Sequence, residues 1–222
     1  MSVKPQHKLE GLYAITDTVQ DDGQRLLAAV EQALRGGARI IQYRDKSDDP
    51  QRRQECAAAL RAMTRRYAAL LIINDDPQLA KRVQADGVHL GQDDATISAA
   101  RALLGEDAII GVSCYNRFEL AQQASARGAD YIAFGRFFAS HTKPHAVRAE
   151  LDLLRRAQQE LAIPVAAIGG ITAENAGDLI AAGADMLAVV HDLFGHDDIE
   201  AAARRYKRCF TPTSTAIAET AE

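Results

Sequence analysis

Two clusters of acidic and amide side chains, each close behind a short apolar segment, are the part of this sequence best suited to chemistry. Residues 74–76 (Asn-Asp-Asp) follow the apolar segment 70–73, and residues 92–94 (Gln-Asp-Asp) follow the apolar segment 87–90. Between them, Pro77 opens a segment long enough for one short helix. Two strands joined in this way lie parallel, so their carboxyl ends meet at one edge of a sheet. The crowded carboxylates predict a hard divalent cation, and Mg²⁺ takes one or two carboxylates together with substrate phosphates.

The rest of the chain repeats this alternation of strand and helix. Short apolar segments recur eight times, at residues 12–15, 40–43, 70–73, 88–90, 109–112, 131–134, 165–168 and 186–190. Most are continuous rather than alternating, as expected of strands buried on both faces of a parallel sheet. We therefore predict an α/β fold that is a single closed (β/α)8 barrel, a TIM barrel. An open doubly wound sheet is the rival, but no glycine-rich dinucleotide fingerprint follows the first strand.

The junctions before several strands resemble one another. They read Gly-Gly-Ala at 36–38, Ala-Asp-Gly at 85–87, and Gly-Ala-Asp at both 128–130 and 183–185. A glycine or another small residue at the end of a helix is what a short loop into a strand requires. We expect one domain over residues 1–222, with a barrel core at about 11–210 and a disordered polar tail at 211–222.

Composition and charge exclude several classes of protein. The net charge of −4 gives no general basic surface, so a nucleic-acid partner is not expected. No apolar run approaches the ~18 residues that a membrane span needs, and the first residues lack the apolar core of a secretory signal. The three cysteines are isolated in the sequence, which favours buried thiols in a reducing cytoplasm.

In a barrel of this kind the active site lies at the carboxyl ends of the strands. Arg44 and Lys46, on either side of Asp45, suit a diphosphate, although a solvated charged turn would have the same pattern. Backbone N–H groups at 169–170 (Gly-Gly) suit a phosphate, and a tight left-handed turn is the alternative there. The hydroxyl-rich basic loop at 140–143 could close over an anion. The joint arrangement of cationic, glycine and acidic loops on one rim is what favours an anion-binding site.

Other potential catalytic groups are sparse. His89 lies within a predicted strand, and we interpret it as a hydrogen-bonded core histidine rather than a metal ligand. The remaining histidines show no zinc-like spacing. No nucleophile elbow and no paired nucleophile and base is apparent.

From Gly11 to about Phe210 the chain resembles the thiamine-phosphate synthase family. The segments that carry the resemblance are LYAITD (12–17), IQYRDK (41–46), IINDD (72–76), DGVHLGQDD (86–94), IGVSCYN (110–116), DYIAFGRFFASHTKP (130–144), PVAAIGGIT (164–172) and GADMLAVVHDLF (183–194). None is specific alone, but their order and spacing together are. The resemblance implies an enzyme that joins a hydroxymethylpyrimidine diphosphate to a hydroxyethylthiazole phosphate, giving thiamine phosphate and releasing pyrophosphate.

The resemblance also implies roles for individual residues. It assigns the pyrimidine diphosphate to Gln42, Tyr43, Arg44, Asp45, Lys46, Asn74, Ser113 and Lys143, with Mg²⁺ on Asp75 and Asp94. It assigns the thiazole phosphate to Ser140, Thr142, Gly170, Val190 and His191, and it counts His141 and Gly169 among the substrate-binding residues. The catalytic residues would be Arg44, Lys46, Ser113 and Lys143, because stabilising charge on the departing pyrophosphate is an electrostatic task. Such a reaction needs positioning rather than a protein nucleophile, which fits the missing triad.

Several positions depart from the commonest family pattern, and all lie on the thiazole side: Arg136, Phe137, Ala139, Ser140 and His191. Two alternatives stay open. One is a thiazole tautomerase on the same barrel, which needs neither metal nor diphosphate pocket, and the other is a non-catalytic regulator that binds thiamine precursors. Retention of Asp75 and Asp94 favours the synthase. The sequence leaves the oligomeric state open, with a homodimer as one option.

Overall fold

The computed structural model describes residues 9–16, 23–92, 94–139 and 147–211. The expected ligands Ser140, His141, Thr142 and Lys143 lie outside these ranges, as does the predicted tail from residue 212 onward. Among the described residues, no helix combines the length and the apolar character that a membrane span needs.

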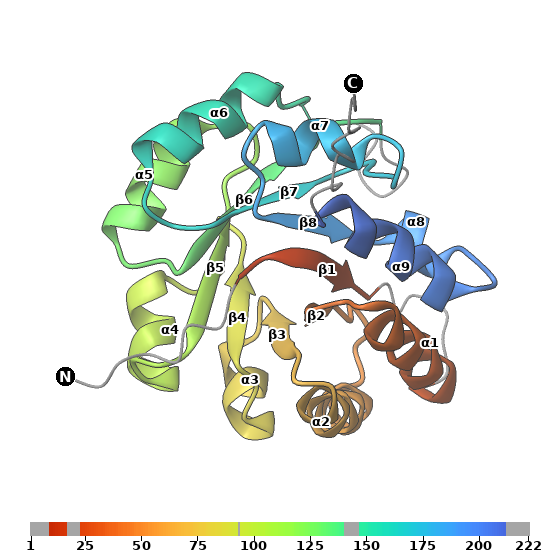
Figure 1. Cartoon of the computed structure of the whole chain (residues 1–222). Helices are drawn as coiled ribbons and strands as arrows, with labels where there is room; N and C mark the ends of the chain where they lie inside the picture. Colours follow the sequence, from red (N-terminus) through yellow and green to blue (C-terminus); the bar gives the residue numbers. More distant parts are fainter. Residues whose placement is uncertain (1–8, 17–22, 93, 140–146, 212–222) are drawn as a thin grey trace, which may run out of the picture.

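Eight parallel strands close into a barrel in which each strand pairs with its neighbours in chain order (Figure 1). The strands are β1 (Gly11–Ile15), β2 (Ile40–Tyr43), β3 (Leu70–Asn74), β4 (Gly87–Leu90), β5 (Ile109–Ser113), β6 (Tyr131–Gly135), β7 (Val165–Ile168) and β8 (Met186–Val189). The last strand pairs with the first, with Leu12 opposite Leu187. This closure confirms the predicted (β/α)8 barrel and excludes the open sheet.

Helices surround the barrel and cover its outer face (Figure 1). They are α1 (Gly23–Gly36), α2 (Pro50–Arg66), α3 (Pro77–Val83), α4 (Ile97–Leu104), α5 (Phe118–Ala126), α6 (Leu151–Glu160), α7 (Ala176–Ala181), α8 (His191–Phe194) and α9 (Ile199–Cys209). Helix α9 packs on α1 so closely that a Cβ at Gly36 would lie 2.4 Å from the Cβ of Ala203. The short α8 is an addition directly after β8, where barrels often form a phosphate site.

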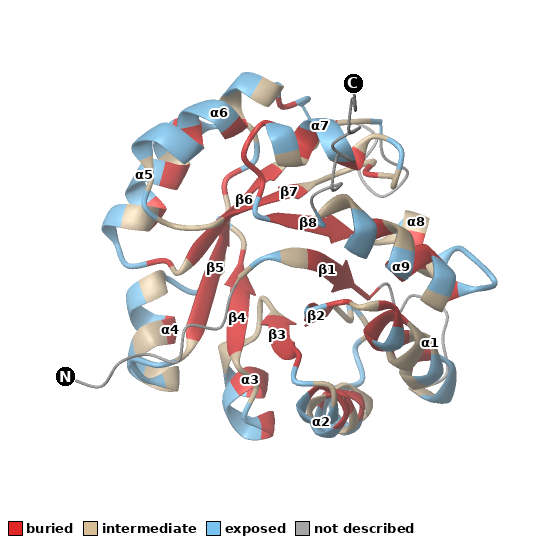
Figure 2. Cartoon of the chain, viewed as in Figure 1, coloured by how far each residue is buried: buried red, intermediate tan, exposed pale blue. Residues whose placement is uncertain are grey.

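The core has two parts, one between strands and helices and one inside the barrel. Figure 2 shows the strands buried along most of their length, while the helices bury the face that meets the barrel and expose the other. The interior is not entirely apolar, because Tyr13 and Tyr131 lie there with exposed fractions of 1% and 0%. Their hydroxyl groups therefore need hydrogen-bond partners within the barrel.

Three of the similar junctions seen in the sequence share one structural role at the amino ends of the strands. In three of the four junctions, all but the one at 36–38, an aspartate Oδ2 accepts a 2.8 Å hydrogen bond from an N–H group of the preceding strand: Asp86 from Leu71, Asp130 from Ile110 and Asp185 from Val165. The same aspartates donate their own N–H groups to the carbonyl oxygens of the same three residues. The aspartate thus closes the gap between two strands where the ladder begins.

We expect Asp130→Ala to lower the free energy of unfolding by about 3 kcal/mol. The substitution removes the carboxylate that pairs with the Arg101 guanidinium and accepts from the N–H of Ile110. Arg101 Nη2 lies 2.6 Å from the Asp130 carboxylate, and both side chains are largely buried. Urea unfolding would measure the change, with Asp107→Ala as the control because Asp107 is exposed on the same end of the barrel. Equal stability of the two variants would contradict the role given to these aspartates.

Candidate active site

Lys46, Asp75 and Asp94 meet at the carboxyl ends of β2, β3 and β4. Lys46 Nζ lies 2.7 Å from Asp75 Oδ2, and the carboxylates of Asp75 and Asp94 are close enough to share a hydrogen bond. Asp94 is held in turn by the N–H of Gly91, at 2.6 Å from Oδ2. The parallel strands therefore bring the two acidic clusters together, as the sequence predicts.

The backbone at Asp75 is unusual and helps to aim its side chain. Its φ of 62° lies in the left-handed region, where aspartate and asparagine are tolerated better than most residues. Its N–H donates to the carbonyl oxygen of His89 on β4, at 2.8 Å. The turn after β3 is thus tied to the neighbouring strand at the residue that carries the carboxylate.

The two carboxylates have different electrostatic environments. Partial burial tends to raise the pKa of Asp75, but the hydrogen bond and charge of Lys46, with the contact from Asp94, hold that pKa below its usual range. Burial raises the pKa of Asp94, and the neighbouring Asp75 charge raises it further. Ionising both groups is therefore costly unless a cation joins them.

These residues fit Mg²⁺ better than a metal held by protein alone. Within the described ranges, which leave out Asp93, no three His, Cys, Asp or Glu side chains gather into a metal-binding group. Two facing carboxylates satisfy an ion that completes its shell with water and substrate phosphate oxygens. A structural zinc site would need four protein ligands.

The loop after β2 is fastened to β1 by Thr16. The Thr16 hydroxyl accepts from the N–H of Arg44 at 3.0 Å and lies 3.3 Å from the carbonyl oxygen of the same residue. Asp45 accepts from the N–H of Ser47 at 2.8 Å and from the Tyr43 hydroxyl at 2.9 Å. Both Asp45 oxygens therefore shape the loop that presents Arg44 and Lys46.

The structure corrects one expected substrate contact, that of the Tyr43 side chain. The ring is 1% exposed and lies in the core between the barrel and the helices, together with Cys56. Side chains alternate between the two faces of a strand, so Gln42 points into the barrel and Tyr43 away from it. The Tyr43 hydroxyl donates to Asp45 from the helix side of the barrel, and the Tyr43 side chain does not reach a ligand.

Inside the barrel, two of the expected ligands are joined by a line of hydrogen bonds. Gln42 Nε2 donates to the Tyr13 hydroxyl at 2.6 Å, and the hydroxyls of Tyr13 and Tyr131 lie 2.7 Å apart. His89 then contacts the Tyr131 hydroxyl through Nδ1 and Ser113 Oγ through Nε2, both at 2.9 Å. The interpretation of His89 as a hydrogen-bonded core histidine is confirmed. Tyr13 and Tyr131 were missed because they stand within apolar segments, and a polar ring in a buried strand is the signal that could have found them.

The glycine pair after β7 has the left-handed conformation that the sequence left open. Gly169 and Gly170 have φ values of 104° and 65°. A Cβ on Gly170 would lie 2.2 Å from the carbonyl oxygen of Ala139, so the loops after β6 and β7 pass in close contact. Asn175 holds the turn by donating from Nδ2 to the Gly170 carbonyl oxygen at 3.0 Å. The close approach brings the expected phosphate loop against the loop that leads to residues 140–143.

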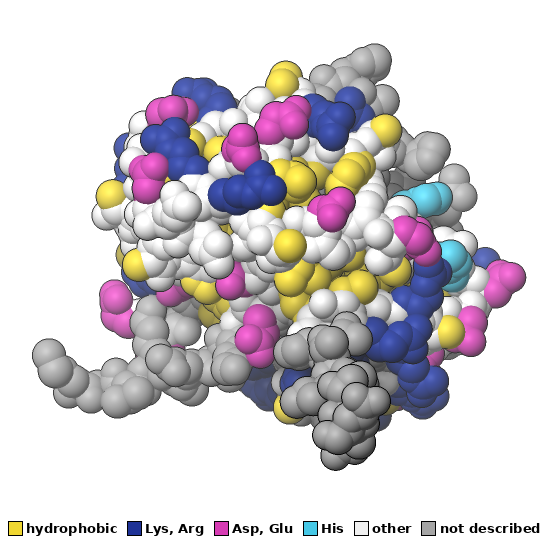
Figure 3. Space-filling model, turned by 45° about the horizontal axis from the view of Figure 1, so that its top comes forward, with side chains coloured by type: hydrophobic (Ala, Val, Ile, Leu, Met, Phe, Trp, Pro, Cys, Tyr) yellow, Lys and Arg dark blue, Asp and Glu magenta, His cyan; other side chains and the backbone are white. Residues whose placement is uncertain are grey.

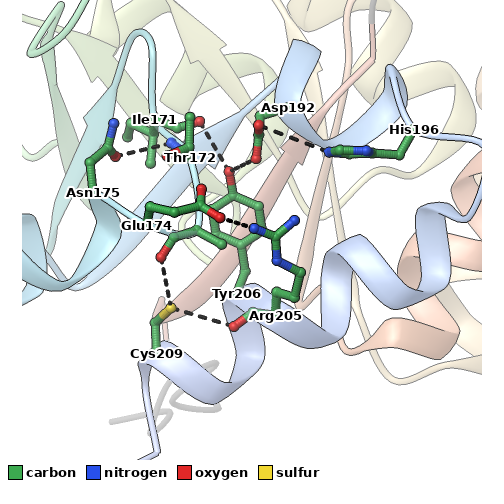
Figure 4. Close-up of polar contacts among 10 residues, drawn as sticks. Ile171, Thr172, Glu174, Asn175, Asp192, His196, Arg205, Tyr206 and Cys209 are labelled. Carbon is green, nitrogen blue, oxygen red and sulfur yellow. Dashed lines mark hydrogen bonds and ion pairs between the residues drawn. The ribbon is translucent and has the colours of Figure 1, made fainter.

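Val190 and His191 lie at the start of α8, next to this loop, and α9 joins the two. Tyr206 of α9 is fully buried, and its hydroxyl lies 2.6 Å from Asp192 Oδ2 and 3.0 Å from the Ile171 carbonyl oxygen (Figure 4). Asp192 follows His191, and Ile171 follows the glycine pair. One hydroxyl on the last helix therefore fixes both segments expected to hold the thiazole phosphate, a role that the sequence did not reveal.

Removing that hydroxyl is expected to loosen this side of the site. Tyr206→Phe should lower the free energy of unfolding by about 1–2 kcal/mol, because the Ile171 carbonyl and Asp192 lose a buried donor. For the two substrates that the resemblance implies, it should also raise the KM for the thiazole phosphate several-fold and leave the KM for the pyrimidine diphosphate unchanged. Steady-state kinetics would test this, with Tyr67→Phe as the control because its hydroxyl donates to Glu31 on the outer surface. An equal rise in both KM values would contradict a role confined to the thiazole side.

The face visible in Figure 3 carries scattered acidic side chains around exposed hydrophobic ones, and basic side chains gather at its lower right. The chain as a whole has a net charge of −4.

Comparison with known proteins supports one family. Residues 12–193 match the family model described as thiamine monophosphate synthase. The thiamine-phosphate synthase of Thioalkalivibrio sulfidiphilus is 55% identical over 91% of this chain and 96% of its own, and that of Alcanivorax borkumensis is 54% identical over 96% and 99%. A solved thiamine phosphate pyrophosphorylase from Pyrococcus furiosus superposes with a TM-score of 0.81 at 34% identity, covering 91% of this chain and 96% of that one. A 3-hexulose-6-phosphate synthase shares only the fold, at 17% identity and a TM-score of 0.67.

Proposed function

The chain belongs to the thiamine monophosphate synthase family, and from that premise we propose which described residues carry each part of its reaction. The enzyme has thiamine-phosphate synthase activity, joining a pyrimidine diphosphate to a thiazole phosphate with release of pyrophosphate. We assign the diphosphate to the side of Gln42, Arg44, Lys46, Asn74 and Ser113, and the thiazole phosphate to the side of Gly169, Gly170, Val190 and His191.

The corner formed by Lys46, Asp75 and Asp94 is the observation that carries the assignment. Lys46 lies 2.7 Å from Asp75, and the second carboxylate has a raised pKa beside the first. Asp75 and Asp94 would hold Mg²⁺, which supplies positive charge for the leaving pyrophosphate when it is bound. A tautomerase or a non-catalytic binder of the thiazole phosphate has no use for such a corner.

The protein's own part in the reaction is positioning and charge stabilisation. The planar guanidinium of Arg44 can donate two hydrogen bonds to a diphosphate. The two contacts of the Thr16 hydroxyl with the backbone of Arg44 fix the position from which that side chain extends. Lys46 stabilises charge on the departing oxygens, as does Lys143, which lies outside the described residues. The electron-rich aminopyrimidine supports positive charge once pyrophosphate leaves, and the thiazole nitrogen held on the opposite side of the rim then attacks. No protein nucleophile is required, because proximity and leaving-group stabilisation lower the barrier.

Pyrophosphate release tests the proposed role of the cation. The purified protein, given both substrates, should release pyrophosphate with Mg²⁺ and lose that activity when a chelator is added. Adding Mg²⁺ back in excess should restore it. Release that is equally fast in chelator would remove Mg²⁺ from the proposal, and tight thiazole phosphate binding without any release would favour the regulator.

We further propose that the reaction takes place in the cytoplasm. Cys56, Cys114 and Cys209 are all free thiols, and the first two are buried, as expected in a reducing compartment. A homodimer remains a prediction, which light scattering coupled to size-exclusion chromatography would check. Small-molecule substrates are the partners that the family implies, and the expectation of no nucleic-acid partner is unchanged.

A further inference from the structure

The hydrogen-bonded line inside the barrel connects one expected diphosphate ligand to another across five strands. It runs from Gln42 on β2 through Tyr13 on β1, Tyr131 on β6 and His89 on β4 to Ser113 on β5. Each step is between 2.6 and 2.9 Å. Four of the five side chains are buried, and Ser113 alone is partly exposed, at the carboxyl end of its strand. The line therefore begins in the core and ends at the rim.

The surroundings hold this line in one geometry. The ring of Tyr13 meets that of Tyr131 edge-on at 6.0 Å, and His89 stacks on Tyr131 at 5.6 Å. Gly111 makes room for the Tyr131 hydroxyl, because a Cβ at residue 111 would lie 2.4 Å from that oxygen. Burial raises the pKa of both tyrosines, so both phenols keep their protons. Each tyrosine can therefore accept one hydrogen bond and donate another.

The first donor sets the direction of the whole line. Gln42 faces Tyr13 with its amide nitrogen, which can only donate, so the Tyr13 oxygen accepts. The buried Tyr13 proton needs an acceptor of its own, and the Tyr131 hydroxyl at 2.7 Å is placed to be that acceptor. Tyr131 in turn donates to His89 Nδ1, which must then be the unprotonated nitrogen of a neutral ring. With this direction, the ring carries its proton on Nε2, which then donates to Ser113 Oγ at 2.9 Å.

We propose that this directed line makes Ser113 a hydrogen-bond donor toward the rim, with Tyr13, Tyr131 and His89 as positioning residues. Because Ser113 Oγ receives the proton of His89, its own hydrogen is not used in the core and is available to an anion. Resting on the function proposed above, the receiving group is an oxygen of the diphosphate, whose developing charge the hydroxyl stabilises. In the opposite direction Ser113 would donate to His89 and could offer the anion only lone pairs.

Nitrogen NMR of the free enzyme tests the direction without substrate, metal or turnover. With ¹⁵N-labelled histidine, the His89 signals, identified by their loss in His89→Gln, should be those of a neutral ring protonated on Nε2. Tyr131→Phe should shift the ring toward a mixture of tautomers, since Nδ1 loses its donor. Tyr206→Phe removes a buried hydroxyl outside the line and should leave the His89 signals unchanged. A ring protonated on Nδ1, or on both nitrogens, would overturn the proposal.

Kinetics tests what the direction does for the reaction. Tyr131→Phe should lower kcat by about tenfold, as expected when a charge-assisted hydrogen bond is misdirected, with a smaller change in KM. In a Ser113→Ala background the same substitution should have no further effect on kcat, because there is no hydroxyl left to direct. Multiplicative losses in the double variant would mean that Tyr131 acts through general stability and would overturn its positioning role. An inactive wild-type enzyme would instead refute the proposed function, while the NMR result would still decide the tautomer.

Discussion

Asp75→Asn is expected to lower kcat/KM for pyrophosphate release by on the order of a hundredfold to a thousandfold. The substitution removes the charge of one of two carboxylates that face each other and leaves Lys46 without its anionic partner at 2.7 Å. Loss of a preorganised charge that acts on a leaving group has effects of this size. Asparagine is the sharpest choice, because it keeps the shape of the side chain and tolerates the φ of 62° at this position.

The same variant should bind Mg²⁺ more weakly, so its remaining activity should need a higher Mg²⁺ concentration than the wild type. Titration of pyrophosphate release with Mg²⁺ would measure both effects. Asp107→Asn is the matched control, since it removes an exposed carboxylate at the amino end of the barrel, away from the rim. If Asp75→Asn kept wild-type activity at low Mg²⁺, the acidic corner would not be the metal site.

Gly170→Ala is expected to raise the KM for the thiazole phosphate by on the order of a hundredfold, since small misplacements of a binding loop are costly. A φ of 65° is less favourable for alanine than for glycine, and the added Cβ would lie 2.2 Å from the Ala139 carbonyl oxygen. The unfavourable φ and the close carbonyl oxygen both belong to the backbone, so a change of side-chain rotamer cannot relieve them. The loops after β6 and β7 must therefore separate. The pyrimidine diphosphate side lies on other strands and should keep its affinity.

Steady-state kinetics with each substrate varied in turn would separate the two sides. Gly177→Ala is the control within the same region, because nothing lies within 4 Å of the added Cβ and the residue is in helix α7. It should leave both KM values unchanged and raise the free energy of unfolding by about 0.5–1 kcal/mol. A similar KM in Gly170→Ala and Gly177→Ala would show that the glycine pair does not form the phosphate loop.

Much of the fold followed from local patterns that the chain carries in every repeat. The segments 40–43 and 70–73 read as buried strands because they are continuous and apolar, and the structure places β2 and β3 there. The repeated small residues and aspartates before strands marked the junctions correctly. The role of these aspartates could not be predicted from the sequence. The N–H groups that donate to Asp86, Asp130 and Asp185 lie 15 to 20 residues earlier in the chain.

The side of a strand on which a residue lies was harder to predict within a continuous apolar segment. Gln42 and Tyr43 stand next to each other in the sequence, and both were expected to contact substrate. Because side chains alternate along a strand, only one of them can face the barrel interior, and the other faces the helices. Burial on both faces removes the alternation of polar and apolar residues that would have distinguished them.

The sequence by itself determined the barrel, the family and the acidic corner, because each depends on residues that are close in the chain or repeat along it. Only the tertiary structure decided which distant groups act together. The line from Gln42 to Ser113 and the contacts of Tyr206 join residues 14 to 118 positions apart, and closure of the barrel is what brings them within hydrogen-bond distance. Hydrogen bonds form over about 3 Å of space whatever the separation of the two residues along the chain. A pattern of neighbouring residues in the sequence therefore does not predict them.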